Sequence, residues 1–263
     1  MLGFAKSEMK SLNSALCDPS QMRRSMEMAA SLESKAGKAI QTLCLDISSF
    51  CSSDFMRFQS LLSSEELAKA DKFRFRMDKN RYVVAHGFLR TLLGTYLNCD
   101  PKALEFGANP YGKPFLKNRS ISNSIFFNVS DSGDRVVYVF NRGGEIGVDI
   151  EKICSDFATQ EVAERFFSDY EVSVFRSLPE NDKVEAFYNC WTRKEAFIKA
   201  VGEGLSYPLK DFDVSLKPGE YAKVLRIRED TKEASEWTLQ EISVALGYKA
   251  AFAIRAKAVS IAK

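Results

Sequence analysis

The sequence has little of several features that mark other classes of protein. Its 263 residues include 37 basic and 35 acidic side chains, so neither charge is in the excess typical of nucleic-acid partners. The longest stretch without a charged residue, Ser120 to Ser130, is far shorter than the ~18 residues of a membrane helix. Charges within the first ten residues interrupt the apolar core of any signal peptide. We therefore expect a cytoplasmic protein that binds neither nucleic acid nor membrane.

Histidine and paired cysteines are also scarce. The one histidine, His86, excludes a multi-histidine metal site, and its place in an apolar helical pattern favours packing or the surface over catalysis. The six cysteines include no C-x-x-C pair, which predicts free thiols rather than a disulfide framework or a zinc cluster. Neither a P-loop nor a G-x-G-x-x-G follows a predicted strand, so an ordinary nucleotide-binding fold is not expected.

What is present is the composition of a globular protein, with 45% hydrophobic residues, and an order of predicted elements that occurs twice. We expect an α+β protein of two similar halves, residues 41–143 and 144–263, consistent with a duplication. Residues 1–40 are expected to be a mobile N-terminal extension with an amphipathic helix near 22–32. The predicted strands cover 43–47, 124–129, 135–140, 145–151, 212–216, 222–227, 237–244 and 248–254, and the predicted helices start at a cap at Ser63 or cover 80–97, 160–167, 170–178 and 183–201.

Two carboxylates share one face of the strand predicted at 145–151. Side chains alternate along a strand, so Ile146, Val148 and Ile150 lie on one face. Asp149 and Glu151 then project together from the other face. Adjacent carboxylates repel each other unless solvent or a cation compensates them, and hard oxygen ligands suit Mg²⁺ or Mn²⁺. The alternative is an exposed strand end without a metal.

A second cluster of charged residues lies at the end of the helix predicted at 183–201. Glu195 and Lys199 are separated by four residues, so they lie on the same helix face, and Gly202 and Gly204 end the helix. Most such pairs are surface ion pairs. If Glu195 instead joins the two strand carboxylates, Mg²⁺ has three protein ligands and Lys199 can meet a phosphate.

A third cluster interleaves cations with aromatic residues from Lys69 to Tyr82. This pattern fits a nucleic-acid backbone, a phosphorylated small molecule, or a solvated helix face above buried Phe73 and Phe75. Lys113, on a turn with glycine and proline, is another fixed cation.

Three motifs in this order and spacing make the chain resemble the surfactin-type 4'-phosphopantetheinyl transferases. The resemblance covers about residues 42–254. The motifs are Phe127-Asn128-Val129-Ser130-x-Ser132-Gly133, Gly147-Val148-Asp149-Ile150-Glu151-Lys152 and Trp191-x-x-Lys194-Glu195-x-x-x-Lys199-x-x-Gly202-x-Gly204-Leu205.

The resemblance implies a pseudo-dimeric α+β enzyme that binds coenzyme A in the cleft between its halves. Such an enzyme moves the phosphopantetheine arm of coenzyme A onto a serine of an apo acyl or peptidyl carrier protein and releases 3',5'-ADP. The implied ligands of Mg²⁺, or of Mn²⁺, are Asp149, Glu151 and Glu195. Lys199 and Lys194 match lysines that face the coenzyme A phosphates, Lys199 on the leaving side. We expect a monomer, because the two halves already form the interface that shorter family members build between subunits.

The resemblance also implies a general base. Glu171, in the segment Arg165-Phe166-Phe167-Ser168-x-x-Glu171, matches a glutamate assigned to deprotonating the carrier serine. An unperturbed glutamate is a poor base at neutral pH, so Glu171 needs a raised pKa or a water relay. Glu151, or a hydroxide activated at the metal, is the alternative base.

The nucleotide end of coenzyme A has its own matching residues. Around the 3'-phosphate and adenosine they are Arg81, Lys113 and Ser130, with Lys69 and Arg76 as further candidates. The chain departs from the family at Asp131, where a histidine is usual. This carboxylate turns outward, is neutralised by Arg74 or Arg76, or weakens binding, and our hypothesis is reduced discrimination for the 3'-phosphate.

Two other functions compete with the transferase. Asp131 alone motivates a non-catalytic module that binds coenzyme A or a carrier protein, and the basic segment from Lys69 to Arg81 motivates weak RNA binding. Carrier proteins are usually acidic helical bundles, so we expect the partner to dock near residues 157–178.

Overall fold

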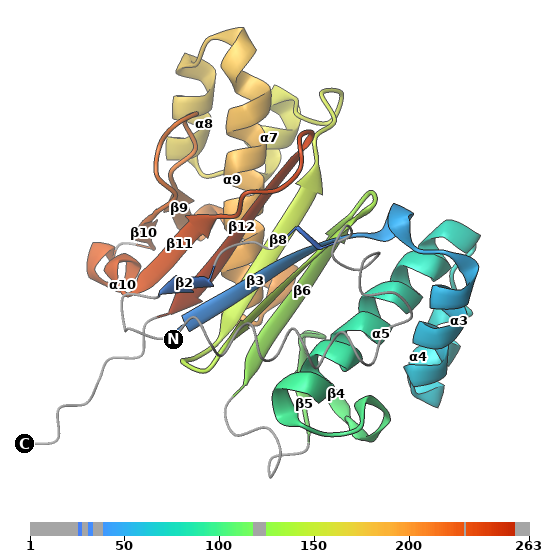
Figure 1. Ribbon diagram of the computed structural model, residues 1–263. Helices are drawn as coiled ribbons and strands as arrows, with labels where there is room; N and C mark the ends of the chain where they lie inside the picture. Colours follow the sequence, from blue (N-terminus) through green and yellow to red (C-terminus); the bar gives the residue numbers. More distant parts are fainter. Residues whose placement is uncertain (1–25, 28–30, 34–38, 118–124, 229, 256–263) are drawn as a thin grey trace, which may run out of the picture.

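Two antiparallel sheets, one from each half of the sequence, lie together in the middle of the computed structural model (Figure 1). The structure describes residues 26–27, 31–33, 39–117, 125–228 and 230–255. The helices of the first half cover one side of this double sheet, and those of the second half cover the other. The expected α+β architecture of two similar halves is confirmed.

The sheet of the first half has the order β1-β3-β7-β6, with β2 also paired to β3. Its long helix, α5, packs on the sheet because an apolar face recurs at helical spacing and fills the core with side chains such as Phe88 and Leu92. The elements of this half are β1 (Met26–Glu27), β2 (Ser31–Glu33), β3 (Ala39–Asp46), α3 (Ser52–Leu61), α4 (Ser64–Ala70), α5 (Arg76–Leu97), β4 (Phe106–Ala108), β5 (Pro114–Leu116), β6 (Phe126–Ser132) and β7 (Arg135–Asn141).

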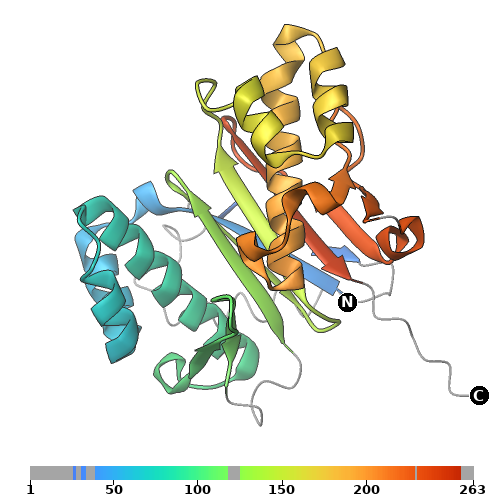
Figure 2. The ribbon, with the colours of Figure 1, turned by 180° about the vertical axis from the view of Figure 1, so that it is seen from behind.

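The sheet of the second half has the order β11-β12-β8, with β9 and β10 paired beside it. Seen from behind, the long helix α9 lies across β8 and β12 (Figure 2). The elements are β8 (Ile146–Lys152), α7 (Gln160–Phe166), α8 (Asp169–Ser177), α9 (Glu180–Val201), β9 (Phe212–Val214), β10 (Val224–Ile227), α10 (Thr231–Ser235), β11 (Trp237–Glu241) and β12 (Tyr248–Arg255).

A separate apolar core joins the inner faces of the two sheets. Val137 and Val139 of β7 pack there with Val148 and Ile150 of β8 and Phe252 of β12. Alternation along β7 sends its other apolar side chains to the core beneath α5. Alternation along β8 likewise leaves Asp149 and Glu151 together on the opposite face, as the sequence predicted, and this face is turned toward α9.

The edges of the two sheets meet along a seam that is made by side chains of one strand. Asn128 Oδ1 accepts the N–H of Val148 at 2.9 Å, and Ser132 Oγ accepts the N–H of Lys152 at 3.0 Å. Between them Ser130 Oγ lies 3.4 Å from the N–H of Ile150. Alternate residues of β6 therefore satisfy alternate N–H groups of β8, and the two strands run parallel without a backbone ladder.

Most predicted elements are present within a few residues of their expected bounds. Ser63 caps α4 with Glu66 as its reciprocal partner, and Gly202 ends α9 in the left-handed region at a φ of 90°. The prediction missed the helices α3 and α10 and the short strands β4 and β5. The expected helix near 22–32 is wrong over the described residues, which pair with β3 as the short strands β1 and β2. The rest of the N-terminal extension lies outside the described residues.

The cysteines that the structure describes are free thiols, as the sequence predicted. They are Cys44, Cys51, Cys99, Cys154 and Cys190, and Cys17 lies outside the described residues. In the part of the chain that the structure describes, no helix combines the length and the apolar surface needed to cross a membrane.

Candidate active site

A glycine lets α9 lie directly on β8. A Cβ added at Gly147 would lie 2.2 Å from both the carbonyl oxygen of Ala196 and the nitrogen of Ala200. These distances are shorter than any real Cβ contact, so no other residue permits this approach. The close crossing brings the two carboxylates of β8, Asp149 and Glu151, opposite the charged face of α9.

The buried carboxylate of Asp149 is the centre of this crossing. Its Oδ1 atom lies 2.6 Å from Lys199 Nζ and accepts the hydroxyl of Ser130 at 2.9 Å, and Lys199 Nζ also donates to Ser130 Oγ at 3.0 Å. Its Oδ2 atom is buried and has no hydrogen-bond partner among the described residues. The structure thus brings Asp149, Lys199 and Ser130 into direct contact across the two halves, and leaves one buried oxygen of Asp149 unsatisfied.

The charges at this site do not balance. Burial and the neighbouring carboxylates raise the pKa of Glu195 to about 7. Burial, and then the charge of Asp149, also raise the pKa of Glu151, whose carboxylate accepts the Ser132 hydroxyl at 2.9 Å. Lys199 is buried as well, but Asp149 and the two glutamates keep its pKa above the ordinary value. Three carboxylates therefore repel one another around a single ammonium group.

A divalent cation fits this set of donors. No three His, Cys, Asp or Glu side chains of the described residues stand close enough to form a complete metal site. However, the unsatisfied Oδ2 of Asp149 and the excess negative charge are what Mg²⁺ or Mn²⁺ would compensate, and all the available donors are carboxylate oxygens. Asp149, Glu151 and Glu195 are thus the residues that could hold such an ion.

Glu171 and Lys194 lie elsewhere, sealed inside the second half. Glu171 is 0% exposed, and its Oε2 atom accepts the N–H of Ser168 at 2.8 Å and pairs with Lys194 Nζ at 2.8 Å. Its Oε1 atom accepts the N–H of Val214 at 2.8 Å. The ammonium of Lys194 also donates to the carbonyl oxygens of Leu209 and Phe212.

This geometry corrects two expectations. No serine of another protein can reach the enclosed carboxylate of Glu171, so its assignment as general base does not fit the structure. Lys194 is 1% exposed and all its donors are engaged, so it does not face a phosphate. Both residues hold the fold of the second half together.

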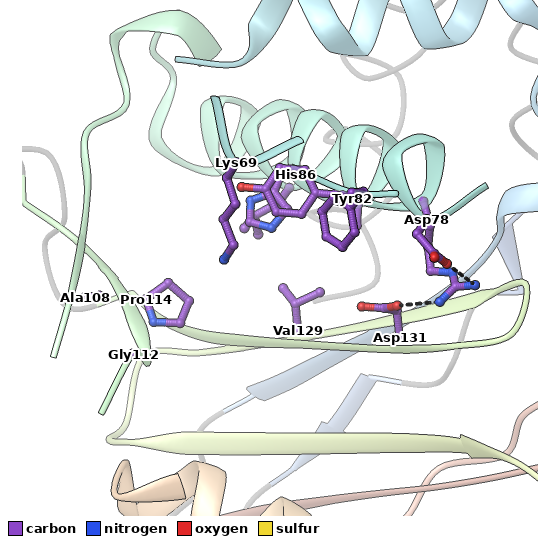
Figure 3. A pocket seen from close by; sticks show the side chains of 13 residues that line it. Lys69, Asp78, Tyr82, His86, Ala108, Gly112, Pro114, Val129 and Asp131 are labelled. Carbon is purple, nitrogen blue, oxygen red and sulfur yellow. Dashed lines mark ion pairs between the residues drawn. The ribbon is translucent and has the colours of Figure 1, made fainter. Parts of the chain in front are cut away.

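The third cluster predicted from the sequence lines a pocket of about 470 Å³ between α5 and β6 (Figure 3). Three predicted residues meet there, namely Lys69 from α4, Arg81 from α5 and Asp131 from β6. Tyr82 and His86 line the same pocket, although the sequence pattern predicted only a packing or surface position for His86 and no pocket position for Tyr82. Their spacing with Asp78 and Leu89 gives one continuous face of α5, a signal that could have identified them as lining residues.

Asp131 points into this pocket and its partner is Arg81. The Nη1 atom of Arg81 lies 3.6 Å from Asp131 Oδ2, and its Nη2 atom lies 3.4 Å from Asp78 Oδ1. Of the three alternatives for Asp131, neutralisation by Arg74 or Arg76 is therefore wrong. Arg76 is exposed at the start of α5 and is not among the pocket-lining residues, while the Arg74 guanidinium lies over the ring of Phe75.

Two other predicted residues are not part of this pocket. Ser130 faces the carboxylate site, since it alternates with Asp131 along β6. Lys113 lines a second pocket of about 560 Å³, where its Nζ atom pairs with Glu145 at 2.6 Å and donates to the carbonyl oxygen of Ala200 at 3.2 Å. Burial lowers the pKa of Lys113. The residues expected around the nucleotide thus divide among the two pockets and the carboxylate site, and Arg76 lies outside all three.

Comparisons with known proteins point to one family. The family model described as the 4'-phosphopantetheinyl transferase superfamily matches residues 145–254, and the model described as 4'-phosphopantetheinyl transferase, N-terminal, matches residues 49–142. The chain is 35% identical over 181 residues to the 4'-phosphopantetheinyl transferase HetI of Nostoc, covering 69% of this chain and 73% of HetI. It is 34% identical over 160 residues to the 4'-phosphopantetheinyl transferase Sfp of Bacillus subtilis, covering 61% and 69%.

Proposed function

This chain belongs to the 4'-phosphopantetheinyl transferase family. From this premise we propose which of its side chains hold the metal ion, bind the pyrophosphate and accept the proton during the transfer. The enzyme transfers the 4'-phosphopantetheine arm of coenzyme A to a serine of an apo carrier protein. A bond forms between the serine oxygen and the phosphorus that carries the arm, the pyrophosphate bond to the nucleotide breaks, and 3',5'-ADP leaves. The observation that carries the assignment of residues is the crossing of α9 over β8, with three carboxylates and one lysine.

Asp149, Glu151 and Glu195 hold Mg²⁺, or Mn²⁺, at this crossing. The unsatisfied Oδ2 atom of Asp149 and the raised pKa values of all three carboxylates support this role. When bound, the ion neutralises charge on the pyrophosphate of coenzyme A.

Lys199 binds the pyrophosphate and stabilises the charge that develops on the leaving 3',5'-ADP. Its ammonium is fixed by Asp149 and Ser130 on the seam between the halves, and its side chain is 29% exposed. The raised pKa keeps it charged at neutral pH. A positioned cation of this kind acts by electrostatic stabilisation of the transition state.

Glu151 accepts the proton of the carrier serine. Of the two glutamates considered as bases, it is half-buried near the solvent end of β8, whereas Glu171 is enclosed. The carrier protein docks along residues 157–178, a segment in which Phe157, Tyr170, Arg165 and Arg176 are all exposed. These residues offer the apolar and basic contacts that an acidic helical partner needs. The chain acts as a monomer, because its two halves already enclose the site.

The experiment that tests this function is the intact mass of an apo carrier protein after incubation with the enzyme, coenzyme A and Mg²⁺. We expect a gain of one phosphopantetheine, lost with EDTA and with Glu195→Gln. Adenosine 3',5'-bisphosphate should appear in equal amount. Binding of coenzyme A without any gain in mass across several carriers would contradict the proposal and indicate a binding module.

A further inference from the structure

The turn between β4 and β5, residues 109–113, lies against the end of the long helix of the other half. Asn109 Nδ2 donates to the carbonyl oxygen of Gly202 at 2.6 Å, and Lys113 Nζ donates to the carbonyl oxygen of Ala200 at 3.2 Å. The last carbonyl groups of a helix have no partner within the helix, and positive charge is favoured beside them. This turn of the first half therefore holds the last turn of α9 in the second half.

The side-chain amide of Asn109 takes part in two structures at once. Its Oδ1 atom accepts the N–H groups of Tyr111 and Lys113, each at 2.9 Å, and so closes the turn. Its Nδ2 atom donates to the carbonyl oxygen of Gly202, and this set of partners fixes which end of the amide is oxygen and which is nitrogen. The conformation of the turn and the position of the helix end are therefore linked through one side chain.

The ammonium of Lys113 joins three elements. It pairs with the carboxylate of Glu145, directly before β8, at 2.6 Å, and it donates to Ala200 in the last turn of α9. The nitrogen of Ala200 is one of the atoms that a Cβ at Gly147 would meet at 2.2 Å. The side chain of Lys113 is only 12% exposed, and burial lowers its pKa although the pair with Glu145 acts in the opposite direction. Lys113 thus holds β8 and α9 together where they cross.

Lys199 is consequently fixed at both of its ends. It lies in the last turn of α9, directly before Ala200, so the turn between β4 and β5 holds its backbone. Its ammonium is held by Asp149 at 2.6 Å and by Ser130 at 3.0 Å. A lysine side chain has many rotamers, and its charged group is positioned only when contacts restrict both the backbone and the tip.

We propose that Lys113 and Asn109 are positioning residues for Lys199, and that they hold the last turn of α9 so that its ammonium meets the leaving 3',5'-ADP. This inference rests on the proposed function, because that function assigns Lys199 to the leaving group. It gives Lys113 a different role from the one expected from the sequence, since its ammonium binds Glu145 and Ala200 rather than a nucleotide. A small displacement of a catalytic group is sufficient to slow a reaction greatly.

Steady-state kinetics distinguish this role from nucleotide binding. Lys113→Met should lower kcat about twentyfold with coenzyme A and 3'-dephospho-coenzyme A alike, and change KM for coenzyme A less than about threefold. Lys113→Arg keeps a cationic donor and should restore kcat to within about threefold of wild type. The matched control is Lys117→Met, which removes an exposed lysine directly after β5. An unchanged kcat with a raised KM for coenzyme A would overturn the proposal.

Asn109→Asp tests the second positioning residue without removing the oxygen that closes the turn. The new carboxylate cannot donate to Gly202, and its charge is unfavourable beside the carbonyl groups at the end of α9. We expect kcat to fall about tenfold while KM for coenzyme A stays within about threefold of wild type. A wild-type kcat in this variant would refute the role of Asn109.

A double variant tests whether Lys113 acts through Lys199. When Lys199→Met is already present, adding Lys113→Met should lower the remaining rate less than about twofold, because the group that Lys113 positions is gone. A further loss of about tenfold would overturn the proposal, because Lys113 would then act on the reaction independently of Lys199.

Amide hydrogen exchange, followed by mass spectrometry, tests the contact without enzyme activity. Exchange in residues 197–204 should be about tenfold faster in Lys113→Met than in the wild type and unchanged in Lys117→Met. Equal exchange in Lys113→Met and the wild type would overturn the proposal. Faster exchange with an unchanged kcat would refute the positioning role and leave the proposed function intact. A wild type that transfers nothing would refute the proposed function, and the exchange rates would still decide whether Lys113 holds α9.

Discussion

The two halves contain the same kind of ion pair, built in the same way, and only one of the two pairs contacts a residue that lines a pocket. In each half a short helix begins with a capping box, and its glutamate, Glu66 or Glu171, pairs with a cation on the long helix that follows. The cations, Arg90 and Lys194, stand at the same position counted from the start of their helices. The pair is therefore a feature of the repeated fold, and the transfer chemistry does not explain it.

The hydrogen bonds that each cation makes to the backbone are also repeated in the two halves. Arg90 donates to the carbonyl oxygens of Pro101 and Leu104, which follow α5, and Lys194 donates to two carbonyl oxygens in the segment after α9. In both halves a cation thus ties the long helix to the chain that leaves it. The difference is that Glu66 also contacts His86 at the pocket, whereas Glu171 is fully enclosed.

The two halves differ at the helix positions that carry the charged residues of the active site in α9. Thr91 and Thr95 of α5 stand where Glu195 and Lys199 stand in α9. Each threonine hydroxyl donates to a carbonyl of its own helix at 3.0 Å, so neither offers a charge to the facing strand. One copy of the scaffold carries the charged site, and the other carries the pocket between α5 and β6.

The largest expected effect comes from removing the charged residues of α9. Lys199→Met should lower the transfer rate by about a hundredfold to a thousandfold, because a positioned cation at the leaving group is lost. Thr95→Ala, at the matching position of α5, should stay within about twofold of wild type. Rates are measured by the mass of the carrier protein. A Lys199→Met enzyme that retained more than a tenth of the wild-type rate would contradict the claim that the charged residues of α9, and not the matching threonines of α5, serve the transfer.

The next effect is on folding. Lys194→Met should destabilise the protein by about 3–5 kcal/mol, because it leaves the carboxylate of Glu171 buried without a partner. The double variant Glu171→Gln with Lys194→Met should be less destabilised than Lys194→Met alone. Urea unfolding measures both values. If Lys194→Met instead kept its stability but lost transfer, Lys194 would face the substrate, as the sequence had predicted.

A third prediction concerns acid stability. The pKa of Glu66 is about 2 when folded, below its ordinary value of 4.5, so its contribution is complete above pH 4.5 and is lost as pH falls from 4.5 toward 2. The loss amounts to about 3 kcal/mol at most. The difference in unfolding free energy between wild type and Glu66→Gln should shrink over this range. A constant difference would mean that the carboxylate of Glu66 is not stabilised by Arg90 and His86.

The smallest effect is expected at Asp131. Its contact with Arg81 is 3.6 Å long and partly exposed, so Asp131→Asn should change stability by less than about 1 kcal/mol. Removing a negative charge from the pocket should lower KM for coenzyme A about threefold and affect 3'-dephospho-coenzyme A less. Equal changes for the two substrates would show that Asp131 does not influence the 3'-phosphate.

The sequence predicted which charged residues share a face, because this grouping follows from the local periodicity of a strand and of a helix. Alternation along a strand groups Asp149 with Glu151, and helical spacing groups Glu195 with Lys199. Local spacing alone does not show that Gly147 is where the helix meets the strand. That contact joins residues almost fifty positions apart, and it emerges only when α9 is packed on the sheet.

The errors at Glu171 and Ser130 have recognisable causes. Ser168-x-x-Glu171 is the same capping-box pattern as Ser63-x-x-Glu66, which was read as a helix start, so the signal for a structural role was present. Ser130 and Asp131 are neighbours on one strand, so their side chains point to opposite faces of the sheet. The position of His86 in the pocket depends on how α5 packs beside β6, which no local pattern specifies.

The seam between β6 and β8 has a consequence for recombining halves of related enzymes. Asn128, Ser130 and Ser132 use their side chains to set which residue of β8 lies opposite each residue of β6. A chimera joined at residues 142–144 therefore needs all three polar residues in the donated first half. Replacing one by an apolar residue would leave a β8 amide without its partner, and at Ser130 it would also remove a contact of Lys199. Compatibility of such halves can be screened by these three positions before any gene is assembled.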